Sequence, residues 1–294
     1  MLFSKLNKNN LLKIFSLFSV VRGYNILFII LAQFICAIFI FSRNLNINLV
    51  LYDVNIWLII FCSAFSISAG YIVNSIYDAK KDLINRPLKT TLENQISGKT
   101  KFTVYILFNL LTLFFASLVS VKAFLFFGIY ILAIIIYSIK ISKYPFVGNI
   151  FSVLLSVTPF FAIMLYYKNY SEEIISHSIF LFFVVLTREV VKDLESFVGD
   201  FTLKYITIPV KYGERVSKWY ITLCSLFILI LSAHILNSYQ ISLMKYYFYF
   251  TNLFYMGFLF FLWKSKSRLS YQKLHNSLKF LIIIGILSIT LHDF

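Results

Sequence analysis

Long runs of apolar residues limit the folds that this chain can adopt. Each run holds the ~20 mostly apolar residues that a helix needs to cross a bilayer, and about nine such runs follow one another. We place them at 20–42, 55–77, 102–120, 122–139, 147–167, 174–192, 217–237, 246–263 and 277–292. Neither strand alternation nor a long repeat stands out, and no soluble domain fits between the runs. The sequence therefore predicts an all-α, polytopic membrane helix bundle of about nine transmembrane helices, with a single domain over residues 1–294.

The composition supports this interpretation and excludes two other classes of protein. Hydrophobic residues make up 60% of the chain and charged residues only 13%, whereas a soluble domain is roughly 25% charged. Such a chain has too little polar surface to coat a soluble globule, and it is too hydrophobic to be disordered. The three cysteines all lie inside apolar runs, without metal-ligand spacing, so we expect them to be packing residues.

The net charge of +15 predicts an orientation for these helices. Loops on the cytoplasmic side of a membrane protein carry an excess of Lys and Arg, and loops on the opposite side carry few. If the N-terminus is cytoplasmic, only four of the 27 basic residues fall on the outer side: Arg43, Lys122, Lys168 and Lys245. We therefore expect a cytoplasmic N-terminus and a C-terminus on the opposite side. The basic loop from Lys264 to Arg268 lacks interleaved aromatic residues, so a lipid bilayer and not nucleic acid is the expected partner.

A first group of polar residues closes the run at 55–77. Asn74, Asp78 and Asp82 are spaced i, i+4 and i+8, so on a helix they lie along one stripe. Ionisable residues at the depth of the membrane are costly and are therefore candidates for a functional site. Two basic residues, Arg86 and Lys89, follow the stripe.

A second acidic group closes the run at 174–192, on the same predicted side of the membrane. Glu189, Asp193, Ser196 and Asp200 follow a spacing of i, i+4, i+7 and i+11, again along one stripe. Two facing carboxylate stripes would repel each other unless a cation lay between them, and Mg²⁺ prefers carboxylate oxygens together with substrate phosphates. Basic residues lie beside both stripes: Arg86, Lys89, Lys140, Lys143, Arg188 and Lys192. The pattern predicts a diphosphate site, with solvated loop charges as the simpler alternative.

Both acidic segments resemble motifs of the UbiA superfamily of intramembrane prenyltransferases. The segment from Asn74 to Asp82 is similar to the family pattern N-D-x-x-D-x-x-x-D, and its continuation Leu-Ile-Asn-Arg-Pro resembles the geranylgeranylglyceryl phosphate and chlorophyll synthase branches. The segment from Arg188 to Asp200 resembles the family's R-E-x-x-K-D-x-E-D-x-x-G-D. Ser75 and Ser196 stand where the family usually has Asp, which removes negative charge from both segments.

Three further segments strengthen the resemblance. Thr207-Ile-Pro-Val with Gly213 matches the family's T-[LI]-P-[VI]…G segment. Arg22-Gly-Tyr-Asn25 resembles R-P-x-N, with Gly23 in place of proline. The stretch from Tyr137 to Asn149 is similar, more loosely, to the family's Y-S-x-x-L-K-R…G-N. Together the similar segments cover most of the chain.

The resemblance implies Mg²⁺-dependent transfer of an isoprenyl group from an isoprenyl diphosphate to a lipid or aromatic acceptor within the membrane. It implies that Asn74, Asp78 and Asp82 hold one Mg²⁺ and that Asp193 and Asp200 hold a second. The four aspartates are then the expected catalytic residues. The residues expected to bind the diphosphate are Arg86, Lys89, Lys140 and Lys143, and those expected to orient the substrate are Arg22, Asn25 and Tyr137.

Two other functions remain open at this point. A terpene cyclase would use the same pocket without a separate acceptor, and a catalytically degenerate scaffold or transporter would keep only the fold. A transporter is expected to show paired Gly or Pro interruptions near mid-membrane, and none is visible. The four histidines form no cluster in the sequence and are assigned no role. Richness in Asn, Lys, Ile and Phe is typical of an AT-rich genome and suggests a bacterial inner membrane.

Overall fold

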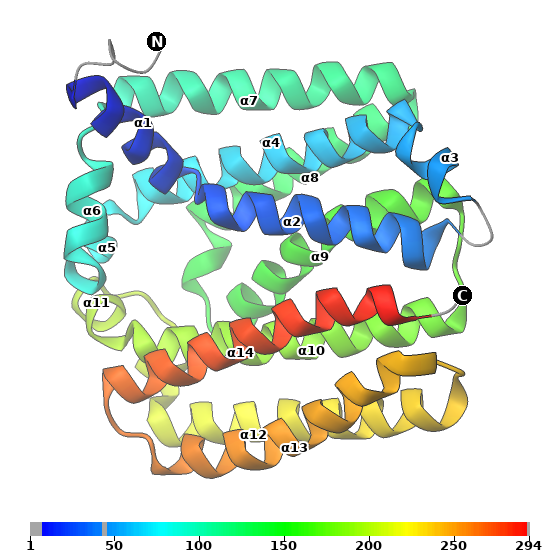
Figure 1. Cartoon of the computed structure of the whole chain (residues 1–294). Helices are drawn as coiled ribbons and strands as arrows, with labels where there is room; N and C mark the ends of the chain where they lie inside the picture. Colours follow the sequence, from blue (N-terminus) through cyan, green and yellow to red (C-terminus); the bar gives the residue numbers. More distant parts are fainter. Residues whose placement is uncertain (1–7, 43–45, 293–294) are drawn as a thin grey trace. The chain divides into compact units, whose positions relative to one another are not determined.

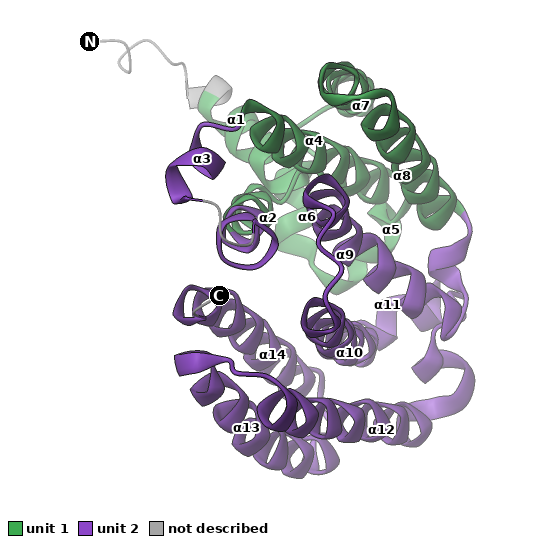
Figure 2. Cartoon of the chain, turned by 90° about the vertical axis from the view of Figure 1, so that its right-hand side faces the viewer, with its two compact units in different colours: residues 1–31, 54–139 green, residues 32–53, 140–294 purple. Residues whose placement is uncertain are grey.

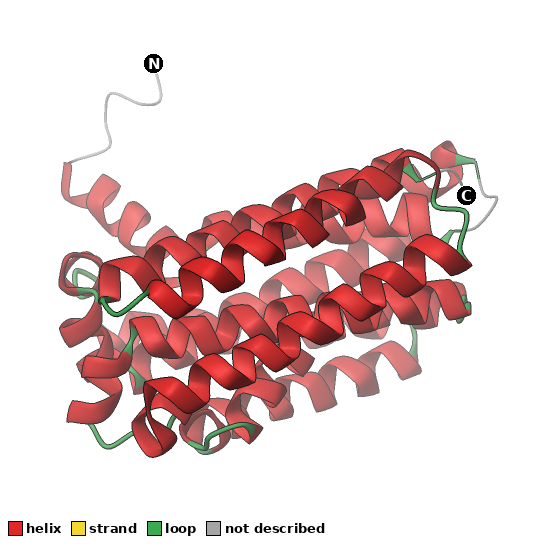
Figure 3. Cartoon of the chain, turned by 90° about the horizontal axis from the view of Figure 1, so that it is seen from below, coloured by secondary structure: helices red, strands yellow, loops and turns green. Residues whose placement is uncertain are grey.

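The computed structural model describes residues 8–42 and 46–292, and within them the regular elements are helices joined by short loops (Figure 3). Within the described residues, eight helices are long and apolar enough to cross a membrane, and they coincide with eight of the nine predicted apolar runs. They are α2 with the π-helical turn η2 (Gly23–Cys36 and Ala37–Phe41), α4 (Val54–Tyr77), α7 (Gly98–Val119), α8 (Val121–Ile139), α9 (Val147–Tyr167), α10 (Glu172–Glu195), α12 (Ile208–Ser238) and α14 (Arg268–Ser288). Figure 1 gives their order along the chain.

The ninth predicted run forms helix α13 (Lys245–Lys264), which is long enough to cross a bilayer but less apolar. Four tyrosines and an asparagine within it lower its hydropathy below that of the other eight helices. Eight clear candidate spans plus α13 agree with the expectation of about nine helices. The predicted break between the runs 102–120 and 122–139 is also present, because Ser120 adopts an extended conformation between α7 and α8.

Short helices fill segments that the apolar runs left as an arm or as loops. Helix α1 (Lys8–Val20) precedes the first span, and α3 (Ile47–Leu51) follows it. Helices α5 (Ala79–Asn85) and α6 (Pro87–Glu93) come directly after the first acidic segment, and α11 (Phe197–Thr202) lies within the second. In Figure 1, α6 runs across the end of α4 and not along it. These helices are too short to stand out as apolar runs, so the sequence pattern alone did not predict them.

The chain divides into two compact units, which Figure 2 shows in green and purple. Unit 1 comprises residues 1–31 and 54–139, and unit 2 comprises residues 32–53 and 140–294. In unit 1, helix α4 packs against α7 and α8. Small side chains on α4 allow close approach: a Cβ atom on Gly70 would lie 3.0 Å from Cγ2 of Ile134 on α8.

In unit 2, helix α10 packs against α9, α12 and α14. A buried group at its centre contains Val153, Val185, Leu186 and Cys224. All three cysteines of the chain are buried and free, which confirms their prediction as packing residues. Helix α12 begins at the Ile-Pro pair after Thr207 and is kinked at Gly213, where φ is 84° and a residue with a Cβ atom would be strained.

Candidate functional site

The first acidic segment continues the path of α4 with two local breaks. Asp78 (φ −93°, ψ 6°) interrupts the helix after Tyr77, and Arg86 (φ −143°, ψ 62°) separates α5 from α6. The second break follows from Pro87, because a residue before proline is driven out of the helical region. Across both breaks, the backbone N–H groups of residues 78, 82, 86 and 90 still donate to the carbonyl four residues earlier, at 2.6–3.0 Å. Asn74, Asp78 and Asp82 therefore keep the helical spacing that was predicted.

A lysine of the following turn lies near the first carboxylate of this stripe. Oδ2 of Asp78 lies 3.8 Å from Nζ of Lys81, and both side chains are partly exposed. A partly exposed pair at this distance contributes at most ~1 kcal/mol. Ser75, where the family usually has Asp, donates its hydroxyl to the carbonyl of Ile72 at 2.8 Å. It thus serves the helix backbone and adds no charge to the stripe.

Arg22 lies beside this stripe, in the turn between α1 and α2. Its backbone is left-handed (φ 52°), a conformation that costs a non-glycine residue ~1 kcal/mol or more. Its guanidinium carbon lies 4.7 Å from the centre of the Tyr71 ring. Burial opposes the charge, but Tyr71, Asp82 and Glu93 outweigh burial and raise the pKa of Arg22. The N–H of Asn25 donates to the carbonyl of Arg22 at 2.8 Å and holds the turn.

Glu93, which lies outside both acidic stripes of the sequence, also belongs to this group. Its carboxylate is 4% exposed, lies 3.3 Å from Nζ of Lys89 and accepts a hydrogen bond from Oγ of Ser19 at 3.1 Å. Burial and the nearby charge of Arg22 lower the pKa of Lys89, while Glu93 partly compensates. The signal for Glu93 was present, since Lys89 and Glu93 are spaced i, i+4 after a proline, but that segment was interpreted as a loop.

The second acidic segment repeats the local geometry of the first. Ser196 (φ −94°, ψ 4°) interrupts the path between α10 and α11, with nearly the same dihedral angles as Asp78. The N–H of Ser196 donates to the carbonyl of Lys192 at 2.9 Å, and that of Asp200 donates to Ser196 at 3.2 Å. The side chain of Asp200 is 1% exposed. The same one-residue break thus falls within the polar stripe of each unit, at Asp78 and at Ser196.

Glu189 and Asp193 both face α9 but are held differently. Glu189 is buried and accepts hydrogen bonds from Arg188 at 2.8 Å, from Lys192, and from Oγ of Ser152 at 3.2 Å. Two of the basic residues predicted to lie beside the stripes therefore neutralise this one carboxylate. Asp193 accepts a hydrogen bond from the side-chain amide of Asn149 at 2.7 Å. A neutral amide fixes the orientation of Asp193 without placing a cation against it.

The segment before α9 places Asn149 and Lys143. A Cβ atom on Gly148 would lie 2.9 Å from the carbonyl oxygen of Ile141, so a glycine is needed where α9 starts against the turn η3 (Ile141–Lys143). Nζ of Lys143 lies 5.4 Å from the Tyr205 ring centre, and its carbonyl accepts from the N–H of Ile206 at 3.2 Å. Lys143 therefore lies against the loop that follows Asp200.

Three other predicted site residues are exposed or partly exposed. Lys140 is exposed at the start of η3, and Arg86 is partly exposed at the break before α6. Tyr137 is partly exposed near the end of α8. Tyr137 falls in unit 1 and Lys140 in unit 2, since the boundary between the units runs between residues 139 and 140.

Two Glu–His pairs occur in unit 2, where the sequence showed no histidine cluster. Nδ1 of His275 on α14 lies 2.6 Å from Oε2 of Glu195, and both residues are buried. Glu195 thus contacts α14, whereas Glu189 and Asp193 face α9. Nε2 of His292 lies 2.9 Å from Oε1 of Glu173, and the ring of His177 lies 6.2 Å from that of His292. The members of each pair are far apart in the chain, so their contact depends on tertiary packing.

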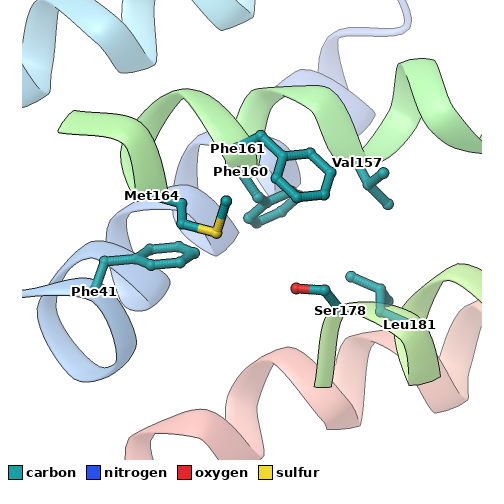
Figure 4. Close-up of a pocket in the computed structure, with 7 residues that line it drawn as sticks. All are labelled: Phe41, Val157, Phe160, Phe161, Met164, Ser178 and Leu181. Carbon is teal, nitrogen blue, oxygen red and sulfur yellow. The ribbon is translucent and has the colours of Figure 1, made fainter. Parts of the chain in front are cut away.

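An apolar pocket lies on the same two helices that carry Asn149 and Asp193. It is a small hollow with a cavity volume of about 20 Å³, and its lining comes from η2, α9 and α10 (Figure 4): Phe41, Val157, Phe160, Phe161, Met164, Ser178 and Leu181. At about 1.5 Å per residue, Leu181 and Ser178 lie roughly 20 Å along α10 from Asp193. Apart from the Ser178 hydroxyl, the lining side chains are apolar, which suits a hydrocarbon chain.

The polar groups of both segments have the donor chemistry of a magnesium site. They offer carboxylate and amide oxygens, which are the ligands that Mg²⁺ prefers. Among residues 8–42 and 46–292, no group of three or more His, Cys, Asp or Glu side chains is arranged to hold a metal ion without further ligands. Mg²⁺ is commonly bound by only one or two carboxylates together with substrate phosphates, so the donor sets fit such an ion in the presence of a diphosphate.

Comparison with known proteins shows which family the chain resembles. The model of the UbiA prenyltransferase family matches residues 31–284, a stretch that runs through both units. A digeranylgeranylglyceryl phosphate synthase of Pyrococcus horikoshii is 33% identical over 155 residues, which are 52% of this chain and 55% of that protein. The protein of the same name from Sulfurisphaera tokodaii is 27% identical over 195 residues, 66% of each chain. The chain thus matches between about half and two thirds of the length of these relatives.

Solved structures agree at the level of the fold. A structure described as digeranylgeranylglyceryl phosphate synthase in membranes superposes with a TM-score of 0.70 at 21% identity, over 94% of this chain and 97% of that chain. A UbiA homologue from Archaeoglobus fulgidus bound to GPP and Mg²⁺ superposes with a TM-score of 0.68 at 17% identity, over 94% and 99% of the two chains. The all-α membrane fold that the sequence predicted is therefore confirmed.

Proposed function

Because this chain belongs to the UbiA prenyltransferase family, we propose that it transfers an isoprenyl group from an isoprenyl diphosphate to a hydrophobic acceptor within the membrane. The observation that carries the proposal is the pair of acidic helix ends. Each keeps an unbroken path of backbone hydrogen bonds through a one-residue break, at Asp78 and at Ser196. Maintaining carboxylates at such positions is costly unless they bind something cationic.

The substrates follow from the relatives and from the pocket. Relatives that match this chain are named digeranylgeranylglyceryl phosphate synthase. We propose a geranylgeranyl diphosphate donor and a geranylgeranylglyceryl phosphate acceptor. The side chains that line the small pocket on α9 and α10 are mostly apolar, as is an isoprenyl chain. The basic residues near the acidic ends suit both the diphosphate and a phosphate on the acceptor.

The residues present would hold two magnesium ions. Asn74, Asp78 and Asp82 would hold one, and Asp193 and Asp200 the second. Bound Mg²⁺ would neutralise negative charge on the diphosphate as its bond to carbon breaks. Asn149 keeps Asp193 in one orientation, with the amide nitrogen 2.7 Å from the carboxylate.

The cationic side chains would act on the leaving group. Arg22, Lys89 and Lys143 are each held by an aromatic ring or a carboxylate, so they can donate to the departing pyrophosphate without reorganising. Arg86 and Lys140 would add positive charge nearby. Apolar spans exclude water from the allylic carbon while it is positively charged. Asn25 and Tyr137 would help to orient the substrate.

The position of the site in the membrane follows the charge distribution. Basic residues gather at the helix ends that carry the acidic segments, so we propose that this side is cytoplasmic, together with the N-terminus. The C-terminus would lie on the opposite side. The relatives that match this chain come from archaea, so the bacterial membrane suggested by the composition stays a prediction.

The experiment is a transfer assay with the full chain purified into lipid nanodiscs. Labelled geranylgeranyl diphosphate is supplied with and without geranylgeranylglyceryl phosphate, in Mg²⁺ or in EDTA, and product mass and pyrophosphate are measured. We expect a prenylated acceptor only when Mg²⁺ is present. Release of pyrophosphate with a cyclised product and no acceptor would indicate a terpene cyclase instead. Absence of pyrophosphate with every prenyl diphosphate tested would indicate a scaffold and overturn the proposal.

A further inference from the structure

Helix α1 presents an apolar stripe to its surroundings, outside the predicted spans. Leu11, Ile14, Phe15 and Phe18 are spaced i, i+3, i+4 and i+7, which places them on one face of the helix. They are 38%, 55%, 61% and 47% exposed. Four large apolar side chains on one helical face form a surface that needs a partner.

The opposite face of α1 packs against other helices of unit 1. Ser16 is fully buried and Val20 is 1% exposed, and α1 contacts α6 and α4. Ser19 donates to the buried Glu93 of α6 at 3.1 Å. This face fixes how α1 sits, so the exposed stripe has a defined direction within unit 1.

The length and position of α1 limit what can cover the stripe. Its 13 residues span about 20 Å, less than the ~30 Å of a bilayer core. Only Val21 and Arg22 separate α1 from α2, which enters the membrane. Lys13, off the stripe, is exposed and basic. A helix with one apolar face, an exposed lysine and a span directly after it matches the pattern of helices that lie in the membrane interface.

We propose that α1 lies in the interface of the leaflet nearest the acidic helix ends, with its apolar stripe among the acyl chains. We further propose that this seating positions Arg22 for the diphosphate, a part that rests on the proposed function. The link is short. Arg22 follows α1 after one residue in a strained left-handed turn, and the Phe18 ring lies against Gly23, where a Cβ atom would be 2.1 Å from it. Ser19 holds the same turn to Glu93, which pairs with Lys89.

The seating is tested by depth measurements that need no catalysis. A nitroxide label is attached to Phe15→Cys and, as the matched control, to Lys13→Cys, in the full chain in nanodiscs. The native cysteines are all buried and should not react. We expect the label at 15 to collide with dissolved oxygen and to be shielded from a polar nickel reagent, and the label at 13 to be accessible to nickel. Nickel access at both positions would overturn the proposal. So would shielding of position 15 from both reagents, which would indicate cover by another protein segment or a second copy.

The coupling to Arg22 is tested by donor binding. Phe15→Ser should weaken the Kd for geranylgeranyl diphosphate roughly tenfold, the effect of losing one hydrogen bond to a charged group. The control is Phe114→Ser, an equally exposed apolar position on α7 that should leave the Kd unchanged. Equal Kd values for Phe15→Ser and the unaltered chain would overturn the coupling. A chain that binds no prenyl diphosphate would refute the proposed function instead, and the depth result would stand.

Discussion

The two acidic helix ends share a backbone geometry but compensate their charges in different ways. In unit 1, Lys89 pairs with the buried Glu93 on the same short helix α6, and Arg22 lies over the Tyr71 ring. In unit 2, Arg188 and Lys192 bind Glu189 on their own helix, and the next carboxylate, Asp193, is held by an amide. Each end thus pairs a lysine with a buried glutamate of its own helix, and the first end adds Arg22 from the turn before α2.

This difference separates positions that the sequence pattern presents as equivalent. Glu189 and Asp193 lie one turn apart on one face of α10, yet Glu189 has two cationic hydrogen-bond partners and Asp193 has an amide partner. A carboxylate that already has two cationic partners gains little from a metal ion, whereas a buried carboxylate held by an amide has more to gain. We therefore expect activity to depend on Asp78 and Asp193, and stability to depend on Glu189.

The largest effect should come from removing one carboxylate at each end. Asp78→Ala and Asp193→Ala should each lower prenyl transfer at least ~100-fold, because even outer-shell partners of metal ligands are worth 10- to 100-fold. Transfer is measured in nanodiscs, and gel filtration verifies the fold. The control is Glu172→Ala, an exposed acid at the other end of α10. Full activity in both aspartate variants would refute the assignment of metal ligands.

A smaller loss should follow from releasing Asp193 without removing it. Asn149→Ala deletes the amide that holds the carboxylate and should lower transfer ~10- to 100-fold. Ser152→Ala is the matched change one turn along α9, where Glu189 keeps its two cations. Raised Mg²⁺ should partly restore Asn149→Ala. Similar losses in the two variants would mean that Asn149 acts only through packing.

Glu189 should affect stability more than catalysis. Glu189→Gln leaves Arg188 and Lys192 beside a neutral group, and we expect a loss of ~1–3 kcal/mol, discounted because both cations are partly exposed. Thermal unfolding in detergent measures the change, with Glu172→Gln as the exposed control. An unaltered unfolding temperature together with lost transfer would assign Glu189 to the reaction instead.

The smallest effect should be on the pH dependence of donor binding at the acidic helix end of unit 1. Burial and the charge of Arg22 lower the pKa of Lys89, so this lysine is charged at low pH and loses its proton at a lower pH than a free lysine. Donor affinity should accordingly weaken as pH rises, beginning below the ordinary lysine range. Lys89→Arg stays charged and should flatten that part of the profile. Identical profiles for the two proteins would show that Lys89 does not face the diphosphate.

The sequence was sufficient for features that depend on local spacing. Runs of apolar length predicted the membrane helices, and spacing of four residues predicted the stripe through Asn74, Asp78 and Asp82, which the backbone ladder preserves. Helix α6 was missed because its seven residues are too few for a periodic pattern, although Pro87 at its start was a usable signal.

Features that depend on contacts between distant segments could not be predicted in this way. Asn149 and Asp193 are 44 positions apart, and Glu195 and His275 are 80 apart. The spacing does not indicate that Glu189 has two cationic partners and Asp193 an amide partner, because both residues lie on the same stripe. Only the packing of α10 against α9 and α14 decides which carboxylate meets which partner.

The contact between Phe18 and Gly23 has a consequence for how the chain can evolve. Gly23 stands where the family pattern has proline, and the Phe18 ring occupies the space that any side chain at position 23 would enter. Restoring the family residue at 23 alone would require the exposed Phe18 ring to turn away from this position. The two positions are therefore epistatic: a glycine that departs from the family pattern is constrained by a phenylalanine five residues earlier, and they are expected to change together.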